Sequence, residues 1–368
     1  MEVDTALDRV GLHYSSDTQP GISRRRCGKG FSYVRADGAR VRDPQTLARI
    51  RALAIPPAYE QVWICSDPNG HLQATGIDAR GRKQYRYHAE WRCIRDADKF
   101  ARLHEFGRAL TRIRKKVATD MRKPRLHRDC VIATVVRLLD RTLIRVGNEQ
   151  YVKENNSYGL TTMRTRHVRV RGSKIRFDFR GKSGVRHSVL IDDPRTAEVM
   201  RCCLELPGQE LFQYLDDAGE PRIVSSTDVN EYLRAAGGED FSAKDFRTWY
   251  ATLSAIEILA PLRFASEREA KAQIKSALTK IAAQLGNTPS MCRKCYVHPG
   301  VLTLFLRDEL HIRAKRGRNG RERLLHLLQC VSKAPDTFAR GTAAKQPSSR
   351  ALGLRRPGRT AKEGRAWL

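Results

Sequence analysis

The sequence has few acidic residues and no long apolar stretch. Its 40 Asp and Glu residues are outnumbered by 69 Lys and Arg residues, which gives a formal net charge of +29 at pH 7. The longest apolar runs, such as residues 131–136 (VIATVV), fall far short of the roughly 20 residues that span a bilayer. The shortage of acidic residues therefore predicts a polyanionic partner, nucleic acid rather than a membrane, and a transmembrane helix is excluded.

Other signals are also missing. Residues 1–8 (MEVDTALD) lack the basic and apolar regions of a secretory signal, so we expect a protein of the reducing cytoplasm with nine free cysteines. The one CxxC motif, Cys292 to Cys295, has no second pair at zinc spacing, which argues against a metal site. GKSG at residues 181–184 resembles part of a phosphate loop, but Arg176 stands where the Walker pattern needs glycine. No nucleotide cofactor is expected.

The patterning divides the 368 residues into four segments. Residues 1–19 show no clear periodicity and are predicted to be a flexible lead-in, whereas residues 20–95 show β-type alternation and two turn signals, ADGA and DPNG. Residues 96–334 have mainly helical periodicity, and residues 335–368 have the composition of a disordered basic tail. The predicted fold class is therefore α+β, with a small β-sheet domain ahead of a mostly α-helical domain.

Three short antiparallel strands are expected within the helical segment, between residues 168 and 191, because apolar residues alternate there between turn signals. This pattern places Lys182 at a hairpin tip. A helix is predicted over residues 267–285, and a short helix from Pro289 up to Pro299 is expected to carry Tyr296.

The segment GRKQYRYH at residues 81–88 interleaves cations with tyrosines on a predicted strand. Cations can contact phosphates, a glutamine can pair with an adenine edge, and tyrosines can pack on sugars or bases, so this segment is a candidate duplex-binding element. On composition alone, a solvated basic strand with two core tyrosines is an equal alternative. The residues concerned are Arg82, Lys83, Gln84, Tyr85, Arg86 and Tyr87.

A set of long motifs, taken together and in this order, resembles the bacterial and poxvirus-type DNA topoisomerases IB. The resemblance covers about residues 20–310 and includes an amino-terminal half with GHLQATGIDARGRKQYRYH. The other motifs are LIRVGNEQY (143–151), SYGLTT (157–162), FRGKSG (179–184), AKDFRTW (243–249) and GNTPSMCRKCYVHP (286–299).

The resemblance implies that Tyr296 attacks a backbone phosphodiester, forms a 3′-phosphotyrosyl link and releases a 5′-hydroxyl. It implies that Arg145 and Arg247 bind the non-bridging oxygens and that Lys182 is the general acid for the leaving oxygen. Asn287 stands where viral and eukaryotic relatives have a histidine, and its amide can still donate to a phosphate oxygen. Because one phosphodiester is exchanged for another of similar energy, the resemblance implies that no ATP is needed. The two guanidiniums can do what metal ions do in other phosphoryl-transfer enzymes, so no obligatory metal ion is expected.

The implied activity is relaxation of positive and negative supercoils by a bacterial monomer clamped around double-stranded DNA, in the nucleoid region of the cytoplasm. The resemblance places DNA contacts at Gln84, Tyr85 and Tyr87 of the first domain. In the catalytic domain it places them at Tyr151, Lys153 and Glu154.

Two alternatives stay open at this stage. A tyrosine site-specific recombinase shares an Arg, Lys, Arg, Tyr set, but it normally has H-x-x-R where Lys244 and Arg247 form K-x-x-R. A non-catalytic architectural protein that coats DNA is compatible with the composition alone.

Overall fold

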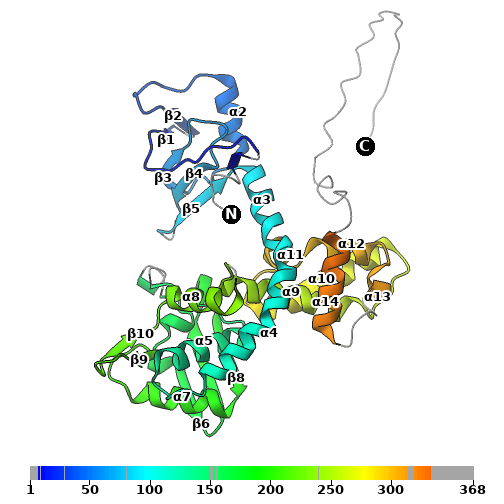
Figure 1. The fold of residues 1–368 in the computed structure, drawn as a ribbon. Helices are drawn as coiled ribbons and strands as arrows, with labels where there is room; N and C mark the ends of the chain where they lie inside the picture. The colour runs from blue at the N-terminus through cyan, green and yellow to red at the C-terminus, as the bar shows by residue number, and fades with distance from the viewer. Residues whose placement is uncertain are drawn as a thin grey trace, which may run out of the picture. The chain divides into compact units, whose positions relative to one another are not determined.

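The computed structural model describes residues 7–332, apart from residues 9, 29, 80, 150–151, 154–155, 239 and 314–318. The predicted basic tail at 335–368 lies outside the described residues, as do Tyr151 and Glu154. The described part contains an N-terminal antiparallel sheet, a mostly helical body and a separate three-stranded antiparallel sheet (Figure 1). The α+β fold class predicted from the sequence is therefore confirmed.

The N-terminal sheet has five antiparallel strands in the order β2-β1-β3-β4-β5. Helix α2 (Pro44–Ala52) packs on it, because its Ile50 joins Ile22 and Ile64 in a small apolar core. The hairpin predicted from DPNG is confirmed as β3–β4, whereas ADGA is followed by only an isolated bridge and β2 pairs mainly with β1. The strands are β1 (Ile22–Cys27), β2 (Gly30–Val34), β3 (Glu60–Ile64), β4 (Leu72–Ile77) and β5 (Lys83–Tyr87).

The described part of the predicted flexible lead-in differs from that expectation. Leu7 and Leu12 are buried in a cluster with Trp91. The Ser15 hydroxyl donates to the carbonyl of Leu72 at 3.1 Å, and the Ser15 N–H donates to the His71 ring at 3.0 Å. These partners lie more than fifty positions away in the chain, so a local periodicity does not reveal them.

The helical body begins with α3 (Ala89–Ala101), so the boundary predicted near residue 95 falls inside this helix. Its main core is largely aliphatic, and aromatic contacts join α4 to α9 within it, where Phe106 of α4 meets Phe246 and Trp249 of α9 edge to face. A Cβ at Gly107 would lie 2.2 Å from the Trp249 ring, which explains glycine at that contact. The remaining helices are α4 (Leu103–Asp120), α5 (Arg128–Thr142), α7 (Pro194–Glu205), α8 (Ser226–Gly237), α9 (Ala243–Leu259), α10 (Glu267–Leu285), α11 (Pro289–Cys295), α12 (Pro299–Leu306), α13 (Leu310–Arg313) and α14 (Gly320–Ser332).

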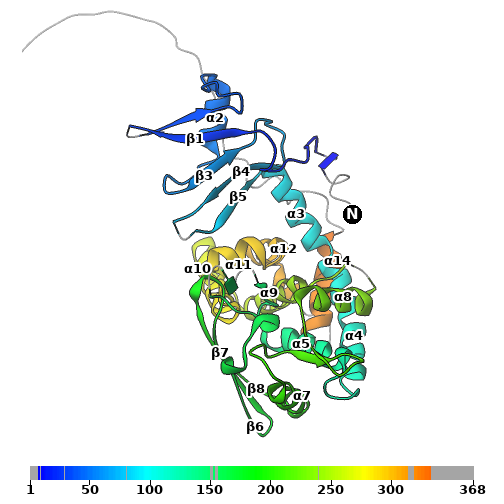
Figure 2. The same cartoon turned by 90° about the vertical axis from the view of Figure 1, so that its left-hand side faces the viewer.

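The three-stranded sheet consists of β6 (Val168–Arg171), β7 (Lys174–Arg180) and β8 (Arg186–Asp192), with α7 beside it (Figure 2). Alternate residues of β7 are buried, as predicted, and a 3₁₀ turn at Lys182–Gly184 joins β7 to β8. The sheet and the hairpin-tip position of Lys182 are therefore confirmed. A short pair that the sequence did not predict, β9 (Gln213–Leu215) and β10 (Pro221–Ile223), forms a second small sheet.

Two negative findings apply to the described residues. No helix there is both long enough and apolar enough to cross a bilayer. No three His, Cys, Asp or Glu side chains in this part of the chain gather as a metal-binding group.

Candidate active site

Arg247 joins three helices at the centre of the site. It lies in the second turn of α9, and only 5% of its surface is exposed. Its guanidinium donates to the carbonyl of Leu143 and, at 2.6 Å, to the carbonyl of Leu285. These carbonyls belong to the C-terminal ends of α5 and α10, where no intrahelical partner is available. Arg247, which is predicted to bind a phosphate oxygen, therefore also connects the ends of α5 and α10.

Arg145 follows the end of α5, where Leu143 adopts a left-handed conformation with φ 57°. Its backbone is held by Leu160, whose N–H donates to the Arg145 carbonyl at 2.9 Å. The Arg145 guanidinium donates to Oδ1 of Asn287 at 2.6 Å. The structure thus brings together two predicted site residues that are 142 positions apart in the chain.

Tyr296 immediately follows α11, which ends at Cys295. The prediction that one helix carries Tyr296 up to Pro299 is wrong, because Pro299 instead occupies the first turn of α12. Thr252 of α9 holds this junction: its hydroxyl oxygen accepts from the N–H of His298 at 3.1 Å and lies 3.1 Å from the Tyr296 carbonyl oxygen. Helix α9 therefore positions the tyrosine as well as Arg247.

Two cations lie close to the Tyr296 ring. The Arg247 guanidinium is 5.3 Å from the ring centroid, and the Lys99 ammonium is 5.2 Å from it. Burial acts to raise the pKa of the Tyr296 hydroxyl, but the charges of Arg247 and Arg145, together with hydrogen bonding from the Arg247 and Asn287 side chains, outweigh burial and leave this pKa lowered. The sequence analysis missed Lys99, since nothing local distinguishes it from other helix-surface lysines.

Lys182 shares a small hollow of about 30 Å³ with Arg145, Arg247 and His187. Partial burial and the charge of Arg145 lower the pKa of its ammonium. A lowered pKa makes an ammonium a better proton donor at neutral pH, provided that it stays protonated. The hollow therefore combines two arginines with a candidate acid.

Two buried donors in this site make no hydrogen bond of ordinary length and angle among the described residues, although their side chains interact with the Tyr296 hydroxyl. They are Nδ2 of Asn287 and Nε of Arg247, and both atoms are buried. Buried N–H groups without partners are rare and cost about 1 to 3 kcal/mol each. An anionic oxygen bound beside Tyr296 would satisfy both groups, so the site has the donors for a phosphate.

The predicted DNA-binding strand β5 exposes its tyrosines. Tyr85 and Tyr87 are 47% and 37% exposed, and their rings stack with centroids 6.1 Å apart. The alternative of two core tyrosines is therefore wrong. Lys153, the described member of the second predicted contact set, is exposed as well.

The polar residues of β5 and of the turn before it have acidic partners. Lys83 pairs with Asp17 at 2.5 Å. Asp78 accepts from both Arg82, at 2.6 Å, and the Gln84 side-chain amide, at 3.0 Å. Any contact with DNA through these three residues would compete with a carboxylate.

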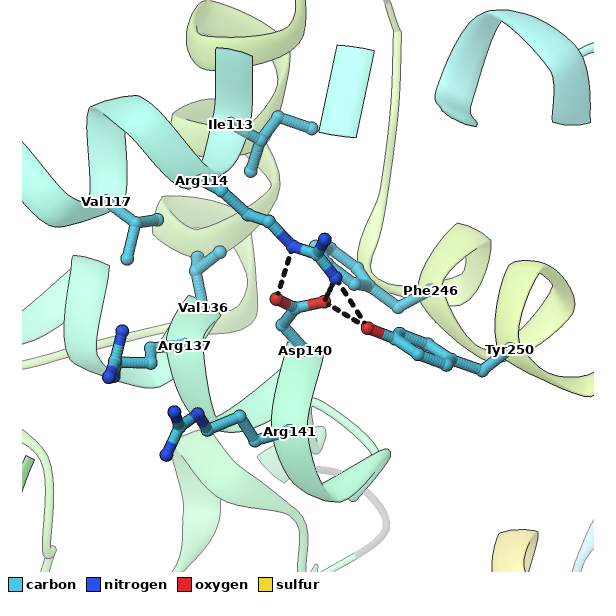
Figure 3. A pocket seen from close by; sticks show the side chains of 9 residues that line it. All are labelled: Ile113, Arg114, Val117, Val136, Arg137, Asp140, Arg141, Phe246 and Tyr250. Atoms are coloured by element: carbon cyan, nitrogen blue, oxygen red, sulfur yellow. Dashed lines mark hydrogen bonds and ion pairs between the residues drawn. The ribbon is translucent and has the colours of Figure 1, made fainter. Parts of the chain in front are cut away.

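A larger hollow of about 490 Å³ lies among α4, α5 and α9 (Figure 3). Arg114 donates to both carboxylate oxygens of Asp140, at 2.9 and 3.1 Å, and to the hydroxyl of Tyr250 at 2.6 Å. The other two arginines of the hollow both pair with Asp193; they are Arg137 and Arg141. Each arginine lining this hollow thus has a carboxylate partner, whereas Arg145 and Arg247 have none within the described part of the chain.

Comparison with known proteins identifies the family. Residues 88–309, more than half of the chain, match the family described as eukaryotic DNA topoisomerase I, catalytic core. The chain belongs to the type IB DNA topoisomerases. Residues 30–78 match the N-terminal domain of bacterial DNA topoisomerase IB. The resemblance noted from the motifs is confirmed.

Viral members of the type IB family are among the relatives. DNA topoisomerase 1B of Acanthamoeba polyphaga mimivirus is 33% identical over 293 residues, which cover 77% of this chain and 87% of the relative. DNA topoisomerase 1B of vaccinia virus (strain Copenhagen) is 24% identical over 261 residues, which cover 67% and 76%. These matches do not favour the recombinase or the architectural alternative.

Proposed function

We propose that this type IB topoisomerase relaxes positive and negative supercoils by cutting one DNA strand, letting it rotate and resealing it. The observation that supports the proposal is that the Arg247 and Asn287 side chains interact with the Tyr296 hydroxyl, while two of their buried donors, Asn287 Nδ2 and Arg247 Nε, make no hydrogen bond of ordinary length and angle among the described residues. A backbone phosphate supplies the anionic oxygens that these donors lack, and the phenol is the nucleophile at the same place.

In the proposed cleavage step, the Tyr296 oxygen forms a bond to phosphorus while the bond from phosphorus to the 5′ oxygen breaks. The charges of Arg247 and Arg145, which lower the pKa of Tyr296, help the phenol lose its proton to solvent water. The same two guanidiniums stabilise the charge that builds on the non-bridging oxygens, and Asn287 adds a neutral donor.

Lys182 is the proposed general acid. The leaving 5′ oxygen would be an alkoxide of high pKa, so it needs a proton as the bond breaks. The position of Lys182 in the same hollow as both arginines and the lowered pKa of its ammonium support this role. Resealing runs the step in reverse: the 5′-hydroxyl returns its proton to Lys182 and the Tyr296 phenolate leaves.

We also propose that the enzyme acts as a bacterial, cytoplasmic monomer that clamps duplex DNA. The exposed stacked pair Tyr85 and Tyr87 and the exposed Lys153 support DNA contacts in both domains. The chemistry exchanges one phosphodiester for another, so we expect it to proceed without ATP or an added metal ion.

The test is relaxation of a supercoiled plasmid in EDTA and without ATP, followed by detergent trapping of any protein–DNA adduct. The wild type should relax both signs of supercoil and form a 3′-linked adduct, while Tyr296→Phe should do neither. Tyr250→Phe is the matched control, because it removes a phenolic hydroxyl from the same helical body at a hydrogen bond to Asp140. DNA binding without relaxation by the wild type would reject the proposal.

A further inference from the structure

His187 lies in the active-site hollow but has no part in the proposed chemistry. It is directly opposite Phe179 in the β7–β8 ladder, and the two rings stack with centroids 5.1 Å apart and an interplanar angle of 14°. The ladder continues for only one more pair before the turn that carries Lys182. His187 therefore lies at the base of the Lys182 hairpin.

The edge of the His187 ring occupies space between two glycines. A Cβ at Gly181 would lie 2.7 Å from Cδ2 of His187, and a Cβ at Gly286 would lie 2.3 Å from its Cε1. Gly181 has φ −94°, which any residue can adopt, so the close approach of the ring explains the glycine there. The imidazole thus fills the gap between the residue before Lys182 and the residue before Asn287.

The ring is electrically neutral in this position. Burial and the positive charges of Arg145 and Arg247 lower the pKa of His187, so it adds no charge to a hollow that already holds two arginines and a lysine. His187 therefore contributes to the site by packing: its ring stacks on Phe179 and lies against the backbone at Gly181 and Gly286.

We propose that His187 is a positioning residue that sets the Lys182 hairpin tip relative to Asn287 and the two arginines. The inference rests on the proposed role of Lys182 as general acid. If His187 is lost, Phe179 loses its stacking partner and the hairpin base can approach Gly286, so the ammonium no longer reaches the leaving 5′ oxygen reliably. A displacement of about 1 Å can cost about 100-fold in rate.

A DNA substrate with sulfur in place of the bridging 5′ oxygen tests this inference. A thiol has a pKa of about 8.5, so a thiolate leaves without the proton that Lys182 supplies to an alkoxide. In single-turnover cleavage, we expect His187→Ala to be about 10- to 100-fold slower than the wild type on ordinary DNA and near the wild-type rate on the sulfur substrate. A merely structural defect would slow both substrates alike.

Three further variants make the outcome decisive. Gly181→Ala disturbs the same contact from the other side and should show the same pattern, which keeps the test valid if His187→Ala does not fold. His187→Gln, which keeps a planar group of similar reach, should recover part of the rate on ordinary DNA. Lys182→Ala should also be slow on ordinary DNA and should cleave the sulfur substrate at close to the wild-type rate.

The results separate the inference from the proposed function. If Lys182→Ala stays slow on the sulfur substrate, its role as general acid is wrong. If Lys182→Ala recovers but His187→Ala and Gly181→Ala stay slow on both substrates, or cleave ordinary DNA at the wild-type rate, only the role of His187 is overturned.

Discussion

Two groups of arginines flank the same pair of helices, α5 and α9, but their partners differ. Around the larger hollow, each arginine pairs with a carboxylate, as Arg114 does with Asp140. Around Tyr296, Arg145 donates to an amide oxygen and Arg247 donates to two backbone carbonyls. Between these two groups, the arginines whose partners are amide and backbone oxygens are the ones that lie beside the predicted nucleophile, whereas Arg24 and Arg49 show that such partners alone do not mark a site.

The physical reason lies in the cost of burying charge. A buried guanidinium keeps its proton, so it needs an anion or many dipoles around it. The arginines of the larger hollow are 30 to 46% exposed, so this cost is small there, and the carboxylates that the protein supplies leave little positive charge for DNA. At Tyr296 it supplies only dipoles, so the charge stays available and the buried Nε of Arg247 makes no hydrogen bond of ordinary length and angle among the described residues.

The sharpest test of the comparison exchanges one arginine from each group for alanine. Arg247→Ala should slow single-turnover cleavage by about 100- to 1,000-fold, as loss of a transition-state donor does in other enzymes. Arg114→Ala should leave the cleavage rate within a few-fold and lower the free energy of unfolding by about 1 kcal/mol, because its ion pair is partly exposed. Rapid-quench cleavage assays and urea titrations measure the two effects.

Arg247→Ala will also destabilise the fold, since it leaves the Leu143 and Leu285 carbonyls without a partner. Arg247→Lys is the control that keeps the charge. The comparison fails if Arg114→Ala slows cleavage as much as Arg247→Ala at temperatures where both proteins are folded.

His298 sharpens the comparison, because it is a buried basic residue that can give up its proton. Burial lowers its pKa to about 4, and its Nδ1 accepts a hydrogen bond from the Gly300 N–H at 3.0 Å. Its pKa when unfolded is 6.5, so below that pH the unfolded chain binds a proton that the folded state resists. The stability contributed by neutral His298 is present above pH 6.5 and is lost as the pH falls toward 4, by up to about 3 kcal/mol.

His298→Asn should remove this part of the pH dependence. Asparagine keeps an acceptor at the start of α12 and does not titrate. Urea unfolding at pH 7 and pH 4.5 should show that the free energy of unfolding falls less with pH for the variant than for the wild type. Parallel losses in the two proteins would mean that His298 takes up its proton in the folded state as readily as in the unfolded chain.

Local features of the site could be predicted from the sequence, whereas its assembly could not. Alternating apolar residues and turn signals place Lys182 at a hairpin tip, and the structure agrees because each signal acts over a few residues. Asn287 and Arg145 meet across 142 positions, and no local pattern specifies that contact; their common role came from the resemblance to a family. The end of α11 was misplaced because a proline can begin a helix as well as follow one.

Strand β5 provides the smallest and most delicate test of the comparison, since its cations are paired yet predicted to contact DNA. Lys83 is 44% exposed and pairs with Asp17, which also accepts from the Thr75 hydroxyl at 2.9 Å. Asp17→Asn keeps an oxygen for Thr75 and releases the ammonium. If Lys83 contacts a phosphate, DNA affinity should rise by about 1.5- to 5-fold, the equivalent of a surface ion pair of about 0.2 to 1 kcal/mol.

The same variant should steepen the dependence of affinity on salt, because a released lysine displaces one more counterion from the duplex. Fluorescence anisotropy at several salt concentrations measures both quantities, and Asp17→Asn combined with Lys83→Gln is the control that removes the gain. An unchanged affinity would place Lys83 with the arginines of the larger hollow, as a cation whose carboxylate partner serves the fold. A gain would show that a partly buried carboxylate only moderates a DNA contact, so that pairing with a carboxylate does not by itself separate structural from functional cations in this protein.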